Sequence, residues 1–255
     1  MAIRALLFDL WGTLVDDSVR GPEPRSVTRA RLAAQALEAA GYAYEQDTIA
    51  AALKAFSTHH TAINAEGRDL APPDRVDLLL ELLDQGLASR VLDDDKRALG
   101  DALAGAIKRH PPIPVPGAHQ ILGAARRRGL VMGLVSNTGW SSGAVLRDLL
   151  SDQGLLHSFQ VLTFSDEACL WKPATGMFTC TLDALAVEAG EAVFIGDWPE
   201  ADVAGALAVG MWAVQIGDHR VDGIEPHARI DTLPELFPAL TGLGLLDQPA
   251  GPTGV

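Results

Sequence analysis

Five short apolar runs constrain the fold of this chain more than any other feature of its sequence. They lie far apart, each bounded by polar residues or glycine, at Ala5–Phe8, Leu130–Val135, Phe159–Thr163, Ala192–Ile195 and Trp212–Ile216. Continuous apolar runs of this length are typical of strands buried on both faces, as the strands of a parallel sheet are. A last short run, Ala228–Ile230, is expected to add an edge strand.

Helical periodicity occupies the intervals between these runs. Apolar side chains recur at helical spacing over Ile121–Ala125, Val145–Leu149 and Phe178–Ala186. Strands that alternate with helices are joined by right-handed crossovers in a single sheet. The sequence therefore predicts an α/β fold, a doubly wound, Rossmann-like parallel sheet with helices on both faces.

One long segment, residues 16–112, interrupts this alternation. It is far too long for a loop, because loops beyond about 12–15 residues are uncommon in compact domains. Its apolar stripes indicate helices only, at Leu32–Leu37, Ile49–Phe56, Val76–Leu83 and Leu99–Ile107. The proline-rich stretch His110–Gly117 closes it as a stiff hinge or linker. We therefore expect an all-helical cap domain at 16–112, inserted into a core domain made of 1–15 and 113–246, and a disordered tail at 247–255.

Composition excludes several classes of protein. The 255 residues hold 20 Lys and Arg against 33 Asp and Glu, a net charge of −13 without a basic cluster, which argues against nucleic-acid binding. No apolar run approaches the roughly 18 residues that a membrane span needs. Two cysteines are too few for a disulfide framework or a thiolate metal site. We expect a cytoplasmic enzyme with a small-molecule substrate, and a homodimer is left open.

Polar residues follow the apolar runs, at the strand ends where open α/β sheets bind their ligands. Asp9 follows the first run, Ser136 and Asn137 the second, Lys172 comes after the third, and Asp197 follows the fourth. Asp202 lies five residues further on. If these ends are neighbours, carboxylates, an ammonium group and hydroxyls converge on one spot.

Such a set of groups has a chemical logic. Clustered carboxylates repel one another unless a divalent cation neutralises them, and Mg²⁺ prefers oxygen ligands. A lysine and a hydroxyl beside them would bind the oxygens of a phosphoryl or carboxylate group. A carboxylate with a free face can act as a nucleophile.

Four motifs, in chain order, resemble those of the haloacid dehalogenase (HAD) superfamily of hydrolases. They are Asp9-x-Trp11-x-Thr13 after the first strand, Ser136 at the end of the next, Lys172-Pro173, and Gly196-Asp197 with Asp202. The helical insertion between the first and second motifs is similar to that of the subclass with a helical cap.

The resemblance implies a role for each motif residue. Asp9 would be the nucleophile, forming a covalent aspartyl intermediate, while Ser136 and Lys172 would bind the transferring group. The cofactor implied is Mg²⁺, with ligands from Asp9, the Trp11 backbone carbonyl, Asp197 and Asp202. The expected substrate-binding residues are Trp11, Gly12, Thr13 and Asn137.

Trp11 departs from the pattern of HAD phosphatases. In those enzymes a second acid at this position protonates the leaving alcohol and then activates water, and such acid–base catalysis is worth about 10²–10⁴-fold. Trp11 can do neither. Either the leaving group needs no proton, or another residue supplies it, or the protein binds a ligand without turnover.

These three alternatives lead to three candidate functions. The first is a Mg²⁺-dependent phosphohydrolase acting on a small phosphorylated metabolite, with reduced or specialised activity. The second is a metal-independent 2-haloacid dehalogenase, since these relatives carry an aromatic residue at this position; they also need a cap arginine, for which Arg29 and Arg31 are the candidates. The third is a non-catalytic module that binds a phosphorylated ligand.

Several residues also have plainer explanations. Trp11 could pack in the core, and Asp202 could cap the helix that follows it. His59 and His60 are expected on the cap surface, because adjacent residues of a helix do not face each other. Lys54 is the one cap lysine placed to act as a Schiff base, as in phosphonoacetaldehyde hydrolase, and is expected instead on a solvated helix face.

Overall fold

The computed structural model describes residues 3–18 and 23–247, and it confirms the predicted α/β fold. A six-stranded parallel sheet has the strand order β5-β4-β1-β6-β7-β8. The strands are β1 Ala5–Phe8, β4 Val131–Ser136, β5 Val161–Phe164, β6 Ala192–Gly196, β7 Trp212–Ile216 and β8 Ala228–Ile230. Each expected strand is present, within two residues of its predicted bounds.

The register of the central strands aligns the ends that carry the first, second and fourth motifs. Phe8 of β1 pairs with Leu134 of β4 on one side and with Ile195 of β6 on the other. Asp9, Ser136 and Asp197 therefore leave the sheet at the same edge. The strand order also reverses at β1, and this switch point is where doubly wound sheets form their ligand crevice.

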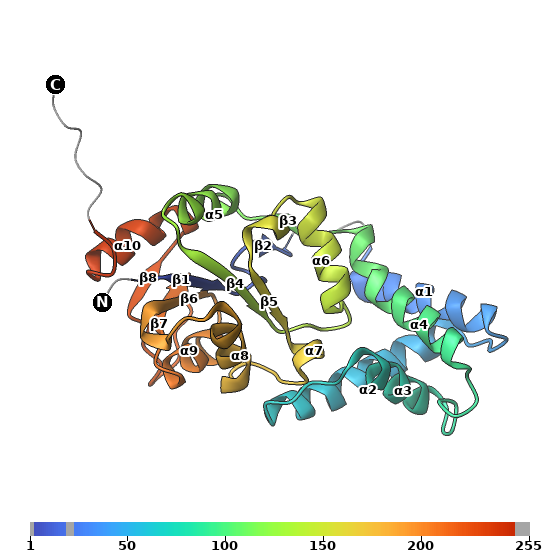
Figure 1. Ribbon diagram of the computed structural model, residues 1–255. Helices are drawn as coiled ribbons and strands as arrows, with labels where there is room; N and C mark the ends of the chain where they lie inside the picture. Colours follow the sequence, from blue (N-terminus) through green and yellow to red (C-terminus); the bar gives the residue numbers. More distant parts are fainter. Residues whose placement is uncertain (1–2, 19–22, 248–255) are drawn as a thin grey trace.

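Helices cover both faces of the sheet, and the alternation along β1 explains why. Leu6 and Phe8 point into a buried cluster with side chains of α5, α6 and α10. Ala5 and Leu7 point to the opposite face, against α8 and α9 (Figure 1). The helices are α5 Ala118–Arg127, α6 Gly143–Asp152, α7 Ser165–Ala168, α8 Thr175–Leu185, α9 Ala204–Ala208 and α10 Leu236–Gly242.

Short helical turns complete the described part of the chain. They are η1 Ala106–Arg109, η2 Leu156–Ser158, η3 Ala189–Glu191, η4 Pro199–Val203 and η5 Leu233–Glu235. Within the described residues, no helix is both long and apolar enough to cross a membrane.

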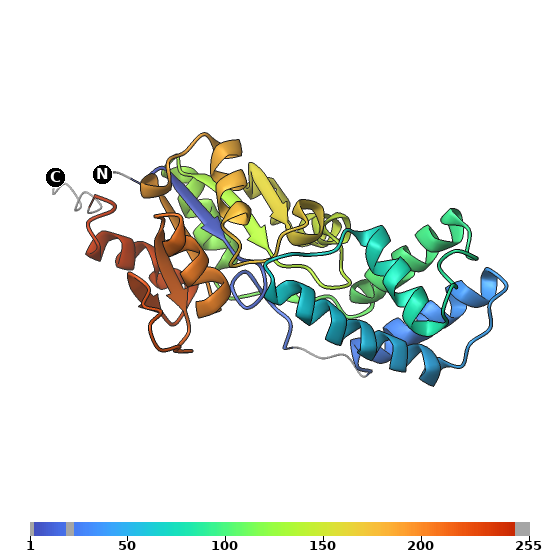
Figure 2. The same ribbon diagram turned by 90° about the horizontal axis from the view of Figure 1, so that it is seen from below.

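Four longer helices form a separate helical layer, the cap, beyond the carboxyl ends of β4 and β5 (Figures 1 and 2). They are α1 Arg25–Ala39, α2 Gln46–Ala65, α3 Pro72–Leu83 and α4 Asp93–Gly105. Their apolar stripes meet in a buried cluster of their own, which includes Ala33, Phe56 and Leu80.

A two-stranded antiparallel ribbon joins the cap to the sheet. It consists of β2 Val15–Asp16 and β3 Ile113–Pro114, with Val15 opposite Pro114 and Asp16 opposite Ile113. The domain boundaries expected after residues 15 and 112 would fall at this ribbon, and they stay a prediction. The predicted disordered tail lies outside the described residues, apart from Asp247.

Candidate active site

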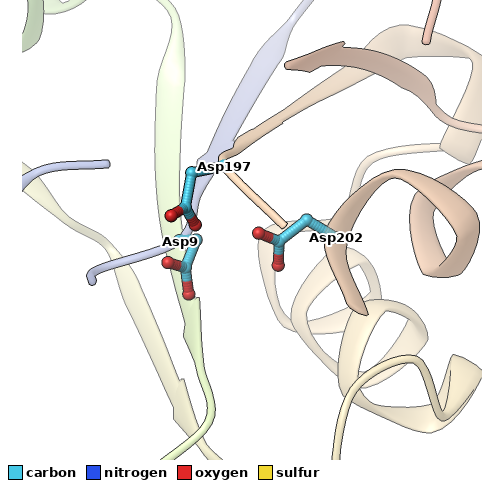
Figure 3. A group of neighbouring side chains, drawn as sticks. All are labelled: Asp9, Asp197 and Asp202. Atoms are coloured by element: carbon cyan, nitrogen blue, oxygen red, sulfur yellow. The ribbon is translucent and has the colours of Figure 1, made fainter. Parts of the chain in front are cut away.

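Three carboxylates converge at the strand ends (Figure 3). Asp9 directly follows β1, Asp197 directly follows β6, and Asp202 lies in the turn η4. One carboxylate oxygen from each lies within 4.8 Å of the other two. Asp9 and Asp202 are buried and Asp197 is half-buried. The pairing of β1 with β6 brings the first two together, because Asp9 N donates to Ile195 O at 2.9 Å.

Lys172 lies among these carboxylates. Its side chain is 2% exposed, and Nζ donates to Asp9 Oδ1 and to Asp202 Oδ1, each at 2.6 Å. Asp202 also accepts from Trp198 N at 3.0 Å, so it closes its own helical turn as well as binding the lysine. The structure thus brings together Asp9, Lys172, Asp197 and Asp202, as expected from the strand ends and the family resemblance.

The negative charges of the three buried or half-buried carboxylates are only partly neutralised by Lys172. Burial, with the charges of Asp202 and Asp197, raises the pKa of Asp9 to about 7 against the opposing effect of Lys172. Burial and the charge of Asp202 raise the pKa of Asp197 to about 6. Burial would lower the pKa of Lys172, but the charges of Asp202 and Asp9 outweigh it and raise that pKa. Fully ionised, three carboxylates and one ammonium group leave a double negative charge, which suits a divalent cation.

The turn after Asp9 approaches Asp197 so closely that only glycine fits. Gly12 has φ +71°, and a Cβ there would lie 2.8 Å from Asp197 Cγ and closer still to Oδ2. The neighbouring Thr13 hydroxyl is buried and makes no hydrogen bond with any described residue. The ligand atoms that the three aspartates offer are carboxylate oxygens, the ligand type that Mg²⁺ prefers. The residues present therefore fit this ion.

The second motif lies beside the lysine and supports it. Ser136 is fully buried, and its Oγ donates to Asn137 O at 3.1 Å. Asn137 Oδ1 accepts from Lys172 N at 2.8 Å, and Asn137 Nδ2 donates to Lys172 O at 3.3 Å. Asn137 was predicted to bind substrate, and in this structure both ends of its amide hold the backbone of Lys172.

Trp11 has the packing role considered for it, and its part in substrate binding stays a prediction. Its ring is half-buried and packs against the apolar cluster on one face of the sheet. Its Nε1 donates to Asn137 O at 3.2 Å, which ties the first motif to the second. An indole offers one N–H donor and no acid.

The cap residues considered from sequence lie elsewhere, and one expectation was wrong. Arg29 Nε donates to Leu103 O at 3.2 Å inside the cap, and Arg31 pairs with Glu23 at 3.4 Å. Lys54 is exposed, as expected. His59 is exposed, but His60 is buried, with Nε2 2.6 Å from Asp69 Oδ1. Adjacent residues of a helix point in different directions, so one of two adjacent histidines can face solvent while the other faces the interior.

Sequence reasoning missed Arg75, a cap residue that contacts the core near the second motif. Its side chain is 3% exposed and donates to Asp69 Oδ2 at 2.7 Å, to Thr138 Oγ1 at 3.0 Å and to Gly139 O. A signal was available, because Arg75 precedes Leu79 by one helical turn and so lies on the apolar stripe of α3. A charged residue on such a stripe is buried with partners or faces a site.

Arg75 also lines a cavity of about 430 Å³. It is bounded by α3, by α4 and by Trp140 and Ser142 of the loop after β4. The three carboxylates do not line it, so we assign the chemistry to the carboxylate cluster and not to this cavity.

The fold and the carboxylate cluster define a class, that of doubly wound α/β proteins with an acidic cluster at the strand ends and a helical layer beyond them. The haloacid dehalogenase-like hydrolase family model matches residues 3–210, and the chain belongs to this family. The motifs of the sequence predicted this family.

Both kinds of relative considered above are similar to the chain. The phosphoserine phosphatase of Thermus thermophilus is 34% identical over 55% of this chain and 56% of the relative. The glyceraldehyde 3-phosphate phosphatase of Methanopyrus kandleri is 26% identical over 88% of each chain. The 2-haloacid dehalogenase of Pseudomonas syringae has a similar fold, with a TM-score of 0.69 and 20% identity over 94% of this chain and 99% of that one. The chain spans about half the length of the first curated relatives it matches.

Proposed function

We propose that this chain is a Mg²⁺-dependent phosphohydrolase that acts on small phosphorylated metabolites through a covalent intermediate on Asp9. The observation that carries the proposal is the uncompensated acidic cluster around Lys172. Phosphate monoesters and 2-haloacids are both anions, and a buried site with two excess negative charges would repel either one. A divalent cation removes this repulsion, and phosphatases are the cation-dependent enzymes among the relatives considered. The phosphatase relatives from Thermus and Methanopyrus support the same choice.

The proposed cation would be held by Asp9, Asp197 and Asp202 together with the backbone carbonyl of Trp11. When bound, it would neutralise the acidic cluster and polarise the phosphoryl group of the substrate. Lys172 and Ser136 would stabilise the phosphoryl oxygens, and the free Thr13 hydroxyl would add a donor beside them.

Asp9 is the nucleophile of the proposed reaction. Lys172 binds Oδ1, which leaves Oδ2 as the oxygen that attacks phosphorus. A bond from Asp9 Oδ2 to phosphorus forms as the bond to the leaving oxygen breaks, and the leaving group departs with the electron pair. Water then attacks the acyl phosphate, releases inorganic phosphate and restores the carboxylate of Asp9.

The absence of an acid at Trp11 determines which leaving groups can depart at a useful rate. Without an acid at this position the departing oxygen leaves as an anion, so the rate depends on how stable that anion is. We therefore propose a preference for acyl and aryl phosphates, whose leaving groups need no proton, over alkyl phosphates.

The test is phosphate release from a matched panel of acyl, aryl and alkyl phosphates, with Mg²⁺ and with EDTA. We expect metal-dependent release, with the alkyl esters slower by about 10²-fold or more. Absence of metal-dependent release from every compound would refute the proposal. Chloride release from 2-chloropropionate that persists in EDTA would instead establish the dehalogenase, which the aromatic residue at position 11 favours.

A further inference from the structure

One cap segment, Gly67–Leu70, contacts the core next to the candidate site. Trp171 N donates to Gly67 O at 2.9 Å, and Asp69 N donates to Cys169 O at 3.2 Å. Arg68 and Leu170 form an isolated antiparallel bridge between these bonds. The core strip Cys169–Trp171 directly precedes Lys172, so the cap is bonded to the backbone that delivers the lysine.

Asp69 is the centre of this contact. Its side chain is fully buried, and Oδ1 lies 2.7 Å from Leu70 N and 2.6 Å from His60 Nε2. Oδ2 accepts from Arg75 Nη2 at 2.7 Å and from Ser165 Oγ at 2.5 Å. Burial alone would raise the pKa of Asp69, but the His60 hydrogen bond and the Arg75 charge outweigh it, and the pKa lies below its ordinary value. Asp69 is thus a buried carboxylate with a donor on every side.

The same cluster holds the loop after β4. Arg75 bonds Thr138 Oγ1 and Gly139 O, and Thr138 N donates to Ser165 Oγ at 2.7 Å. The next aromatic residue, Trp140, packs on Phe56 of α2 with ring centroids 4.2 Å apart. The cap therefore fixes the loop after β4 by both polar and aromatic contacts.

The two anchored loops meet at Asn137 and Lys172. Each end of the Asn137 amide bonds the Lys172 backbone, and Lys172 Nζ extends from there to Asp9 and Asp202. Two chains of bonded residues thus connect Asp69 with the Lys172 ammonium group. One passes through Cys169–Trp171, and the other passes through Thr138 and Asn137.

We propose that Asp69, acting with Arg75, is a positioning residue that holds Lys172 Nζ between Asp9 and Asp202. Stability alone is a weak reason for such a buried ion pair, because apolar residues in its place are often as stabilising or more so. A carboxylate that accepts from three donors of the cap and from Ser165, the first residue of α7, instead fixes one geometry for two loops. The effect on turnover rests on the proposed function, whereas the effect on the loops does not.

The experiment compares the full-length chain with Asp69→Asn, which keeps the shape but removes the charge and one acceptor. The matched control is Asp84→Asn, an exposed cap aspartate paired with Arg90. Hydrogen exchange is measured on peptides that contain the amides of Thr138 and Lys172, whose acceptors are Ser165 Oγ and Asn137 Oδ1. We expect exchange of both peptides to rise by about tenfold or more in Asp69→Asn and to stay at the wild-type rate in the control.

Kinetics provide the second measurement. For the substrate that the wild type hydrolyses fastest, kcat should fall at least about tenfold in Asp69→Asn while KM changes little, because the lysine acts mainly on the transition state. Arg75→Lys, which keeps the charge but loses the planar fork, should reproduce both effects and replaces Asp69→Asn should that variant not fold.

The outcomes separate the two proposals. Wild-type exchange of both peptides in the variants, or a kcat equal to that of the control, would show that Asp69 only anchors the cap and would overturn the inference. A wild type that releases no phosphate would refute the proposed function, and the exchange measurement would then decide the positioning role alone.

Discussion

Asp197→Asn tests the electrostatic argument for a cation most directly, because it removes one charge from the acidic cluster without changing its shape. The folded protein raises the pKa of Asp197 from 3.8 to about 6. Above pH 6 the ionised side chain therefore costs stability, by at most about 3 kcal/mol. The side chain is half-buried and partly screened by solvent, so we expect about 1–2 kcal/mol.

The sign follows from proton binding. Between pH 4 and 6 the folded chain holds the proton of Asp197 more tightly than the unfolded chain does, so this group's contribution to stability falls as the pH rises. Without metal, Asp197→Asn should be more stable than the wild type at pH 7.5. The gain should be about half as large at pH 5 and about a fifth as large at pH 4.

The assay is urea unfolding in EDTA at these three pH values, with the exposed Asp183→Asn on α8 as control. Added Mg²⁺ should stabilise the wild type by mass action and the Asp197→Asn variant much less, because the variant has lost a ligand. An Asp197→Asn variant that is less stable than the wild type at pH 7.5 in EDTA would refute the reasoning.

Two further predictions concern the first motif. Trp11→Asp should raise Mg²⁺-dependent release from alkyl phosphates, by up to about 10²–10⁴-fold, if only the general acid is missing; unchanged rates would mean that the pocket does not accept these substrates. Gly12→Ala should cost about 1–3 kcal/mol of stability in urea unfolding, from its positive φ and the collision with Asp197, and should weaken the Mg²⁺ response. The exposed Gly139, where a Cβ meets nothing within 4 Å, supplies the control Gly139→Ala, and equal losses would refute the packing argument.

The sheet and the carboxylate cluster were predictable from sequence because one physical rule produces each. Strands buried on both faces leave uninterrupted apolar runs, and residues that follow such runs in a parallel sheet gather at one edge. Asp9 and Asp197 needed only that rule, since β1 and β6 are neighbours. Lys172 needed the family resemblance as well, because it lies eight positions beyond Phe164, the last residue of β5.

The contact between cap and core was not predictable in the same way. Asp69 lies in a connection between helices, and neither periodicity nor a motif marks it. Arg75 and His60 left a fainter signal, because each lies one helical turn from a buried apolar residue, Leu79 and Phe56 respectively. Such a position shows that a polar residue faces inward, but its partner comes from another segment of the chain, and only the tertiary structure brings the two together.

The ribbon formed by β2 and β3 has a consequence for how this protein can be rebuilt. Asp16 and Ile113 are paired directly across it, so the chain leaves the sheet and returns to it at nearly the same point. A tight hairpin turn such as Asn-Gly could span that gap and replace the whole insertion without shifting a strand. The helical layer can therefore be removed or exchanged at this ribbon without changing the strand order, but an insert without Asp69 and Arg75 would also remove the hydrogen bonds that hold the loops around Lys172.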